Sequence, residues 1–261
     1  YIGNDRSPKG NVDEKIRPLV DLINRHQEYV TLSSCSGRVA LFDPAGTTHA
    51  ANTSIIDRTN NNPISEQQIK GTQQSGKGRG KWIFVTHDIL PDLGPQIIES
   101  LIAIGQERYL RRQSSTENTI DEPPITFKHE PPLLHVAAAS LEAGKKLLHI
   151  AKSVCAMRES GLVVTDQRVT VELRTTGTLL CVPLMVQPES FAVSLVPSEE
   201  YLLSLAENAN ERMVQNELLL EKLFATIQEE LFEKRIDQNT AKMTTSYEET
   251  GNKEYKVNMQ P

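Results

Sequence analysis

Apolar positions near the start of the chain recur with helical spacing. Ile16, Leu19, Val20 and Ile23 follow one another at intervals of three or four residues, which predicts an amphipathic helix over residues 13–26. Pro18 falls inside this pattern, and because proline is favoured in a first helical turn, the helix is expected to begin close to it. Three β-type runs follow at residues 29–32, 38–42 and 81–86, and the small residues at 33–37 predict a turn between the first two.

The second half of the chain repeats this order of patterns. Ser140 is positioned to cap a helix over residues 141–157, and strand-like runs follow at 161–164, 168–173 and 179–186. The same order of helix and three strands indicates an internal duplication, in which the turn around Asp166 corresponds to the one at 33–37. Chance similarity between two α+β segments is the alternative interpretation.

Further segments complete the predicted architecture. Residues 96–112 and 199–236 predict helices, and residues 125–136 an extended segment broken at Pro131 and Pro132. We therefore predict an α+β fold with mixed β-sheets, flanking helices and a long C-terminal helix. One domain is expected over residues 1–236, with a flexible polar insertion at 43–80, a linker at 113–124 and a polar tail at 237–261.

Charge is distributed unevenly along the 261 residues, whose formal net charge is −6. Residues 1–112 carry 14 Lys and Arg against 12 Asp and Glu, whereas residues 113–261 carry 14 against 22. If the protein contacts RNA, the N-terminal half is the expected face, because phosphates attract basic side chains. The RNA-binding candidates are Lys9, Lys15, Arg25 and Lys81. Solvated surface charge is the simpler explanation for most basic residues.

Cysteine usage and hydropathy limit the compartment and the metal chemistry. Cys35, Cys155 and Cys181 are widely spaced and form no CxxC pair, so neither a disulfide framework nor a zinc site is predicted, and no metal is expected. No secretory signal is visible, and no apolar run approaches the roughly 20 residues that span a bilayer. A reducing, cytoplasmic location is expected.

The stretch from Ser33 to Arg38 collects small polar side chains and a glycine. Gly37 can adopt a positive φ, which allows a ligand to approach the backbone closely. The hydroxyl groups of Ser34 and Ser36 can bond a base edge, and Arg38 can clamp a carboxylate or a phosphate. From these residues alone, an ordinary tight turn is the simpler explanation.

The strand over residues 81–86 brings two further candidates. His87, at its end, can act as a base or bond a ligand, and Trp82 can stack on a purine. A turn histidine and a core tryptophan are the alternatives. Cys35 is a nucleophile only if a nearby base such as His87 activates it, and a buried inert thiol is the alternative.

A second set of candidates follows in the C-terminal half. Glu130 can accept hydrogen bonds from a ribose, whereas His135 lies in an apolar strand where a core histidine is usual. Arg158, Ser160 and Gly161 either bind an anion or end a helix. Walker, GxSxG and HExxH motifs are absent, as is the glycine loop that follows the first strand of common methyltransferases.

Several separated motifs together resemble the tRNA wybutosine-synthesizing protein 3 family. They are SPKG with Asp13 three residues later, SSCSGR at 33–38, GKW at 80–82, KHEPPLLHV at 128–136, MRESG at 157–161 and YLLSLAENANERMVQN at 201–216. The first two are specific, and the later ones follow in the family's order. The resemblance covers most of residues 5–231.

The resemblance implies a methyltransferase that is not of the Rossmann type. It would use S-adenosylmethionine to methylate a ring nitrogen of the wyosine-type base beside the anticodon of phenylalanine tRNA. The resemblance implies catalytic roles for His87, Ser34 and Arg38, and other wybutosine-pathway enzymes as further partners. It also implies that the residues holding the methyl donor are Ser36, Trp82, Glu130, His135, Arg158, Ser160 and Gly161.

Three rival interpretations remain at this point. The chain could be a non-catalytic subunit that presents the modified base to a partner enzyme, and binding of the methyl donor would separate the two. It could instead be a hydrolase that depends on Cys35, which full activity of Cys35→Ser would exclude. A purely structural domain predicts that Arg38→Ala changes stability or nothing.

Overall fold

Two four-stranded sheets form the body of the protein in the computed structural model, which describes residues 11–44, 56–57, 62–63, 80–114, 123–187, 194–195 and 197–233. The first sheet has the order β1 (Tyr29–Cys35), β7 (Leu133–Ala138), β9 (Val169–Arg174), β8 (Gly161–Val164). The second sheet has the order β10 (Leu180–Leu184), β6 (Ile125–Glu130), β2 (Arg38–Asp43), β5 (Lys81–Thr86). Two short pairs join β3 (Ile56–Asp57) to β4 (Asn62–Pro63) and β11 (Val186–Gln187) to β12 (Ser194–Leu195).

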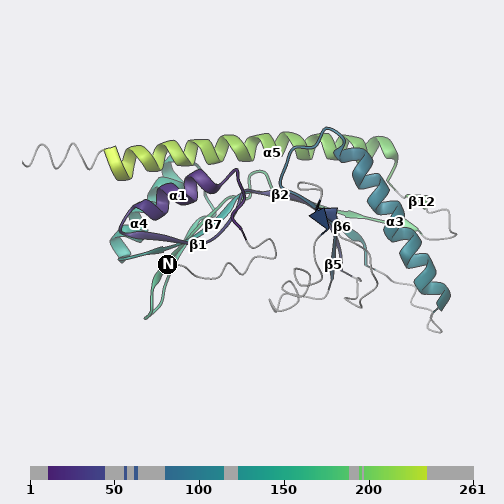
Figure 1. The fold of residues 1–261 in the computed structure, drawn as a ribbon, viewed down its shortest axis with the longest axis horizontal. Helices are drawn as coiled ribbons and strands as arrows, with labels where there is room; N and C mark the ends of the chain where they lie inside the picture. Colours follow the sequence, from purple (N-terminus) through teal and green to yellow (C-terminus); the bar gives the residue numbers. More distant parts are fainter. Residues whose placement is uncertain are drawn as a thin grey trace, which may run out of the picture.

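Helices cover one face of each sheet (Figure 1). They are α1 (Arg17–Arg25), α3 (Leu93–Ser114), α4 (Leu141–His149) and α5 (Glu199–Gln228), with π-helical turns at Ile150–Val154 and Glu229–Glu233. Helix α1 begins next to Pro18, as predicted, and the Ser140 hydroxyl accepts a hydrogen bond from the Ala143 amide at 3.1 Å, which caps α4. Helix α5 runs along both sheets and ties them together.

The chain passes between the two sheets three times at one place. It crosses after β1 at Ser36 and Gly37, after β6 at Pro131 and Pro132, and after β9 at residues 175–179. We call this place the sheet junction and define it as residues 35–38, 129–133 and 174–180. Neighbouring crossings are in register, since Arg38 lies opposite Glu130 and Leu133 opposite both Cys35 and Arg174.

Alternating side chains divide each sheet into a packed face and an open face. In β6 the buried positions Ile125 and Phe127 join a core with α3 and the N-terminal part of α5. In β7 the buried positions Leu134 and Val136 join a second core with α1, α4 and the C-terminal part of α5. The intervening side chains point away from α5, and we call this side of both sheets the open face.

The α+β class and the long C-terminal helix are confirmed, while two details of the predicted architecture are wrong. The sheets were expected to be mixed, but every pairing among the described residues is antiparallel. The expected duplication also fails, because the chain changes sheets at Ser36 and Gly37 whereas the turn around Asp166 is a hairpin within the first sheet. Periodicity identifies a strand but not the sheet that it joins.

The predicted turn at 33–37 is shorter than expected. Strand β1 continues to Cys35, with a register shift between Thr31 and Ser33, and only Ser36 and Gly37 form the crossing. Most of the predicted insertion at 43–80, most of the 113–124 linker and the tail at 237–261 lie outside the described residues. No helix in the described part of the chain is long and apolar enough to cross a membrane.

Candidate functional site

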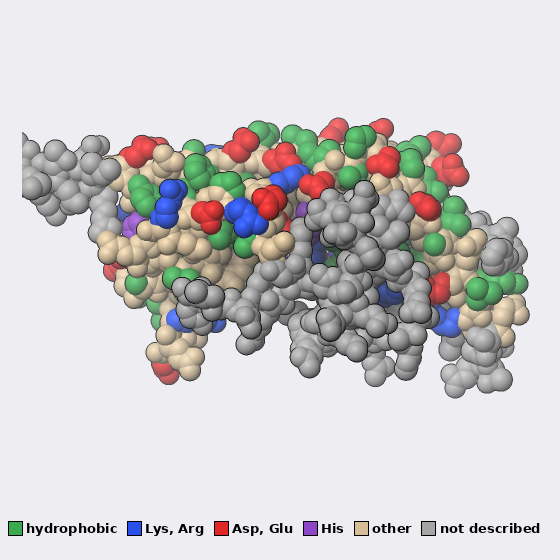
Figure 2. All heavy atoms as spheres, viewed as in Figure 1, with side chains coloured by type: hydrophobic (Ala, Val, Ile, Leu, Met, Phe, Trp, Pro, Cys, Tyr) green, Lys and Arg blue, Asp and Glu red, His purple; other side chains and the backbone are tan. Residues whose placement is uncertain are grey.

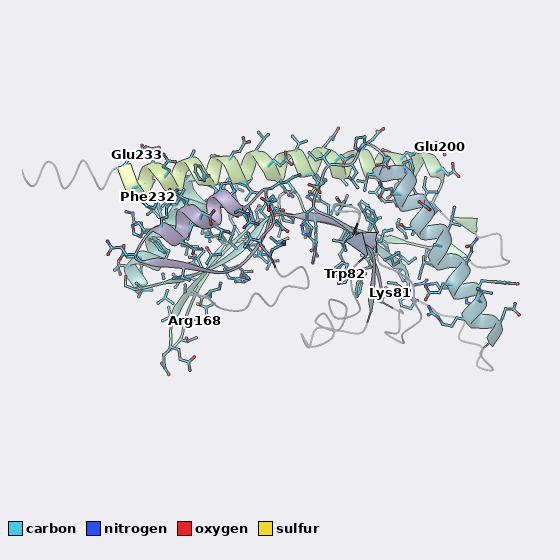
Figure 3. The ribbon with its side chains drawn as sticks, viewed as in Figure 1. Lys81, Trp82, Arg168, Glu200, Phe232 and Glu233 are labelled. Carbon is cyan, nitrogen blue, oxygen red and sulfur yellow. The ribbon has the colours of Figure 1, made fainter. Side chains whose placement is uncertain are left out.

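Arg38 and Glu130 form an ion pair on the open face at the start of β2 and the end of β6. Arg38 Nε lies 2.5 Å from Glu130 Oε2, and both side chains are about 30% exposed, at 31% and 30%. The Arg38 guanidinium also lies 4.7 Å from the ring centroid of Trp82, which is half-buried against Phe42. Trp82 is therefore an aromatic surface beside a charged pair, with Lys128 5.6 Å from its ring. Figure 3 shows Trp82 and Lys81 on β5, away from α5.

His87 lies on the other side of the same crossing, beside Asp13. Its Nδ1 is 2.9 Å from the Gly37 carbonyl oxygen and 3.4 Å from Asp13 Oδ2. A carbonyl oxygen only accepts hydrogen bonds, so Nδ1 carries the proton in the neutral ring and Nε2 is the nitrogen that can accept one. Asp13 Oδ2 accepts hydrogen bonds from the Ser36 amide at 3.1 Å and the Ser36 hydroxyl at 3.2 Å. Asp13 therefore joins the loop before α1 to the crossing and to His87.

Gly37 is required at this position by both conformation and space. Its φ is +99°, in the left-handed region that other residues rarely adopt. A Cβ atom would lie 2.3 Å from Asn216 Nδ2 and 3.0 Å from the Glu130 carbonyl oxygen. The predicted positive φ is thus confirmed, and it brings the Gly37 carbonyl within hydrogen-bonding distance of His87.

A buried polar network lies between the sheet junction and α5. Asn216 is 1% exposed, accepts a hydrogen bond from the Thr178 hydroxyl at 2.9 Å and places Nδ2 3.2 Å from His129 Nε2. His129 Nδ1 donates to the Thr178 carbonyl at 2.7 Å, which leaves Nε2 as the acceptor for Asn216. Burial lowers the pKa of His129, so the ring is neutral at neutral pH. One side chain of α5 thus lies against all three segments of the sheet junction, at Gly37, His129 and Thr178.

Cys35 is near His87 but is not activated. The nearest metal-ligating atoms of Asp13, Cys35 and His87 lie within 4.8 Å of one another. Burial raises the pKa of the Cys35 thiol, although the Gly37 backbone and Arg38 act in the opposite direction. The protonated thiol disfavours the hydrolase interpretation. Separations of up to 4.8 Å are also wider than the roughly 3.5 Å between ligands of a tetrahedral zinc ion.

A second charged group occupies the open face of the first sheet. Glu172 Oε1 lies 3.7 Å from Arg174 Nη1 and 3.8 Å from His135 Nε2. The Ser33 hydroxyl lies 2.9 Å from His135 Nδ1 and holds the ring in place. His135 is 36% exposed in its side chain, so it is not the core histidine that its apolar strand favours. Glu172 thus lies beside both basic side chains, at distances longer than a direct hydrogen bond.

The other predicted donor-binding residues lie at the edge of this second group. The Ser160 hydroxyl is buried and donates to the Arg174 carbonyl at 3.1 Å while accepting from the Arg174 amide at 2.9 Å. Gly161 begins β8 opposite Glu172, and Arg158 is exposed. Ser34 is half-buried in β1 opposite Leu134. The structure therefore brings Arg38, Trp82 and Glu130 together and places His135 beside Glu172, whereas Ser34 lies on the packed face of the first sheet with Leu134.

The predicted RNA-binding residues are scattered. Lys15 pairs with Glu217 at 2.6 Å and Asp88 at 3.4 Å, so it fastens the loop before α1 to α5. Arg25 is exposed at the end of α1, and Lys81 pairs with Glu107 at 3.2 Å. Lys9 lies outside the described residues. Acidic side chains recur along α5 at the top edge of Figure 2, which disfavours this edge as an RNA surface.

Sequence reasoning assigned no role to several residues that the structure brings to the site. They are Asp13, Ser33, Glu172, Arg174 and Asn216. Asp13 follows the SPKG motif by three residues, and Glu172 lies within the predicted strand over 168–173, whereas Arg174 lies just beyond it. Asn216 had no signal of its own, because a polar residue in a long helix is usually solvated.

One hollow among the described residues lies elsewhere. It has a volume of about 470 Å³ and is lined by Pro95, Ile98, Glu99, Ile102, Glu199 and Leu203, between α3 and the start of α5. Leu203 and Asn216 are roughly 20 Å apart along α5, from the helical rise per residue. The apolar hollow is thus remote from the charged side chains and the histidines, and we place the candidate site at the junction.

The fold and the site define a class of protein. It is an α+β protein in which the described residues form no glycine-rich nucleotide loop. Its open face combines an aromatic platform with two arginine–glutamate pairs, and His87, whose tautomer is fixed, lies on the other side of the first crossing. Such a surface suits a flat aromatic ligand that carries both charges.

Comparison with known proteins supplies the family. The family model described as "Methyltransferase TYW3" matches residues 2–229, so the chain belongs to this methyltransferase family and is an enzyme. It is similar to tRNA wybutosine-synthesizing protein 3 of Saccharomyces cerevisiae, at 30% identity over 90% of this chain and 79% of the relative. The Schizosaccharomyces pombe protein of that name is 28% identical over 81% of this chain and 74% of its own length.

Archaeal relatives extend the comparison to structure. A Pyrococcus horikoshii protein named tRNA(Phe) 7-((3-amino-3-carboxypropyl)-4-demethylwyosine(37)-N(4))-methyltransferase 1 is 29% identical over 84% of this chain and 86% of its own. A solved Pyrococcus horikoshii structure aligns with a TM-score of 0.57 at 25% identity, covering 84% of this chain and 87% of the other. A solved Aeropyrum pernix structure, 19% identical with a TM-score of 0.52, shares the fold.

Proposed function

We propose that this protein takes part in wybutosine biosynthesis by methylating a ring nitrogen of the wyosine-type base in phenylalanine tRNA, with S-adenosylmethionine as methyl donor. The names of its relatives support the pathway and the tRNA substrate. The observation that carries the proposal is the Arg38–Glu130 pair beside Trp82 at the sheet junction. We treat residues 1–236 as one catalytic unit, because α5 packs on both sheets.

The residues at the junction fit the proposed donor. Trp82 offers an aromatic face for adenine, while Arg38 and Glu130 offer opposite charges for the carboxylate and the ammonium group of its methionine part. The sulfonium of S-adenosylmethionine supplies an electrophilic methyl group. The protein's task is then to align the acceptor nitrogen and to keep it unprotonated.

His87 is positioned to remove a proton from that nitrogen. Its Nδ1–H donates to the Gly37 carbonyl, so Nε2 is the atom that takes the proton. As the nitrogen–methyl bond forms, the carbon–sulfur bond breaks and the sulfur becomes a neutral thioether. Asp13, 3.4 Å from His87 Nδ1, stabilises the imidazolium that results. Gly37 and Ser36 hold both partners at the crossing.

Donor binding tests the proposal. We expect calorimetric titration of S-adenosylmethionine into the purified protein to give saturable one-site binding. Arg38→Ala should weaken binding roughly 10- to 100-fold, the usual loss for a charge-assisted contact. Arg112→Ala on α3 removes the same charge away from the junction and should leave the affinity unchanged. Absence of binding both with and without phenylalanine tRNA would contradict the enzymatic proposal.

A further inference from the structure

The two substrates of the proposed reaction carry the same chemical group. The archaeal relative is named for a base that bears a 3-amino-3-carboxypropyl side chain. The methionine part of S-adenosylmethionine is a 3-amino-3-carboxypropyl group attached to sulfur. An enzyme that uses both must hold two identical zwitterions at once without exchanging them.

Each zwitterion requires one cation and one anion at fixed positions. A carboxylate is best bound by an arginine, whose planar guanidinium donates two parallel hydrogen bonds, and an ammonium group by a carboxylate. Among the described residues, two arginine–glutamate pairs lie on the open face, namely Arg38 with Glu130 and Arg174 with Glu172. The number of pairs equals the number of zwitterions.

The two pairs are close enough to serve one reaction and far enough apart to hold separate ligands. Arg38 begins β2, which continues β1 across the junction, and Arg174 ends β9. The chain of β6 and β7 runs between them, with Leu133 opposite both Cys35 and Arg174. Cys35 and Arg174 are therefore two strand spacings apart, or roughly 10 Å, and Arg38 follows Cys35 by three residues. A tricyclic base can bridge such a gap.

The geometry of the pairs differs in a way that assigns them. Arg38 and Glu130 are in direct contact at 2.5 Å, beside Trp82, and about 30% exposed. Arg174 and Glu172 are 3.7 Å apart, with side chains 50% and 34% exposed. The more enclosed pair suits a small nucleoside, and the more exposed pair can be reached by a base attached to a large RNA. His135 lies 3.8 Å from Glu172 and completes the second site.

We propose that Glu172, Arg174 and His135 bind the aminocarboxypropyl side chain of the tRNA base, whereas Arg38 and Glu130 bind the identical group of the methyl donor. This inference rests on the proposed function and adds a second site to it. Glu172 takes the ammonium group and Arg174 the carboxylate. The Ser33 hydroxyl holds the His135 ring through Nδ1, so Nε2 is the nitrogen that contacts the bound side chain.

The side-chain site predicts a loss of selectivity rather than of catalysis. Methylation is measured with two phenylalanine tRNAs, one whose base carries the aminocarboxypropyl group and one whose demethylwyosine base lacks it. Wild-type enzyme should prefer the first. Arg174→Gln and Glu172→Gln should each raise KM for the first tRNA roughly 10- to 100-fold and change KM for the second less than about threefold. Arg168→Gln, at the tip of the same hairpin (Figure 3), should preserve the preference.

Binding of two analogues of the methyl donor distinguishes the two sites. Arg38→Gln should weaken binding of S-adenosylhomocysteine but not of 5′-methylthioadenosine, which lacks the amino-acid group, and Arg174→Gln should affect neither. The assignment of the second site would be overturned if KM rose equally for both tRNAs. It would also be overturned if Arg174→Gln lost binding of S-adenosylhomocysteine without a change in its thermal midpoint. Neither result would contradict the proposed function. Failure of the wild type to bind donor and to methylate either tRNA would overturn the assignment together with the proposed function.

Discussion

The two halves of the molecule use the same architecture but different polar contacts. The half built on the second sheet closes its charges in pairs, since Arg108 and Asp43 are 2% and 0% exposed and 2.6 Å apart. The half built on the first sheet has a core of apolar side chains with Tyr29, whose hydroxyl donates to the Ala143 carbonyl at 2.9 Å. On its open face, Glu172 lies 3.7 Å from Arg174 and 3.8 Å from His135, so these charges are not in direct contact.

This difference indicates which polar groups stabilise the fold and which can bind a ligand. A fully buried pair such as Arg108–Asp43 fixes the backbone, whereas partly exposed charges, those of Arg38 and Glu130 and those around Glu172, can bind a ligand. The junction between the halves has the densest network, where Asn216 and His129 lock the three crossings to α5. We therefore expect substitutions of the buried polar residues in the second half and at the junction to alter stability, and substitutions around Glu172 to alter selectivity.

The buried ion pair should give the largest effect. Arg108→Met leaves the Asp43 carboxylate buried without this cation, and we expect a loss of about 3–5 kcal/mol in the free energy of unfolding. Lys145→Ala breaks the exposed pair with Glu142 in the other half and should change little. Urea unfolding measures both. If the two variants are equally stable, the distinction between the halves fails. If Arg108→Met/Asp43→Leu regains the free energy of unfolding that Arg108→Met loses, the loss is due to the buried carboxylate left without its cation.

Two glycines provide a matched comparison of junction and sheet edge. Gly37→Ala forces a Cβ to within 2.3 Å of Asn216 Nδ2 at φ +99°, so we expect a loss of about 1–3 kcal/mol in unfolding free energy. Gly161→Ala meets nothing within 4 Å and should be neutral or slightly stabilising. Thermal unfolding of both variants tests this order. If Gly161→Ala were less stable than Gly37→Ala, the backbone at Ser36 and Gly37 would have to shift to accommodate the added Cβ.

The smallest predicted effect is a dependence of stability on pH at the junction. Burial lowers the pKa of His129 below its usual 6.5, with the Thr178 carbonyl acting in the opposite direction, Arg212 lowering it and Glu130 raising it. The unfolded chain therefore binds a proton first as the pH falls, so this stability is complete above 6.5 and is lost as the pH falls through the lowered pKa.

Variants isolate this contribution. His129→Gln should flatten the fall in stability between about pH 7.5 and pH 5, whereas His149→Gln, exposed on α4, should not. Urea midpoints at several pH values supply the comparison. An unchanged slope in His129→Gln would show that other groups control the acid sensitivity.

Local patterns predicted the elements more fully than their assembly. The bounds of β5, the cap at Ser140 and the positive φ of Gly37 follow from neighbouring residues, and each is confirmed. The division into two sheets depends on pairing across the junction, such as Arg38 with Glu130, which lie 92 residues apart. No local pattern contains that information.

The candidate site was predicted in part for the same reason. Arg38, Trp82 and Glu130 were all named, and the structure brings them together. Asp13, Glu172 and Arg174 were given no role, because a charged residue at the start of a predicted helix, or in or next to a predicted strand, has the same pattern whether it is solvated or binds a ligand. Their proximity to His87 and His135 became visible only in three dimensions.

Methyl transfer itself tests the central claim most directly. Radiolabelled S-adenosylmethionine is incubated with undermethylated phenylalanine tRNA and either the wild type or His87→Asn, and the modified nucleoside is isolated. We predict label on a ring nitrogen of the wyosine-type base, with the single-turnover rate reduced roughly 100-fold or more in His87→Asn and donor affinity unchanged. No transfer by the wild type, or equal rates in both proteins, would contradict a reaction centred on His87 at the sheet junction.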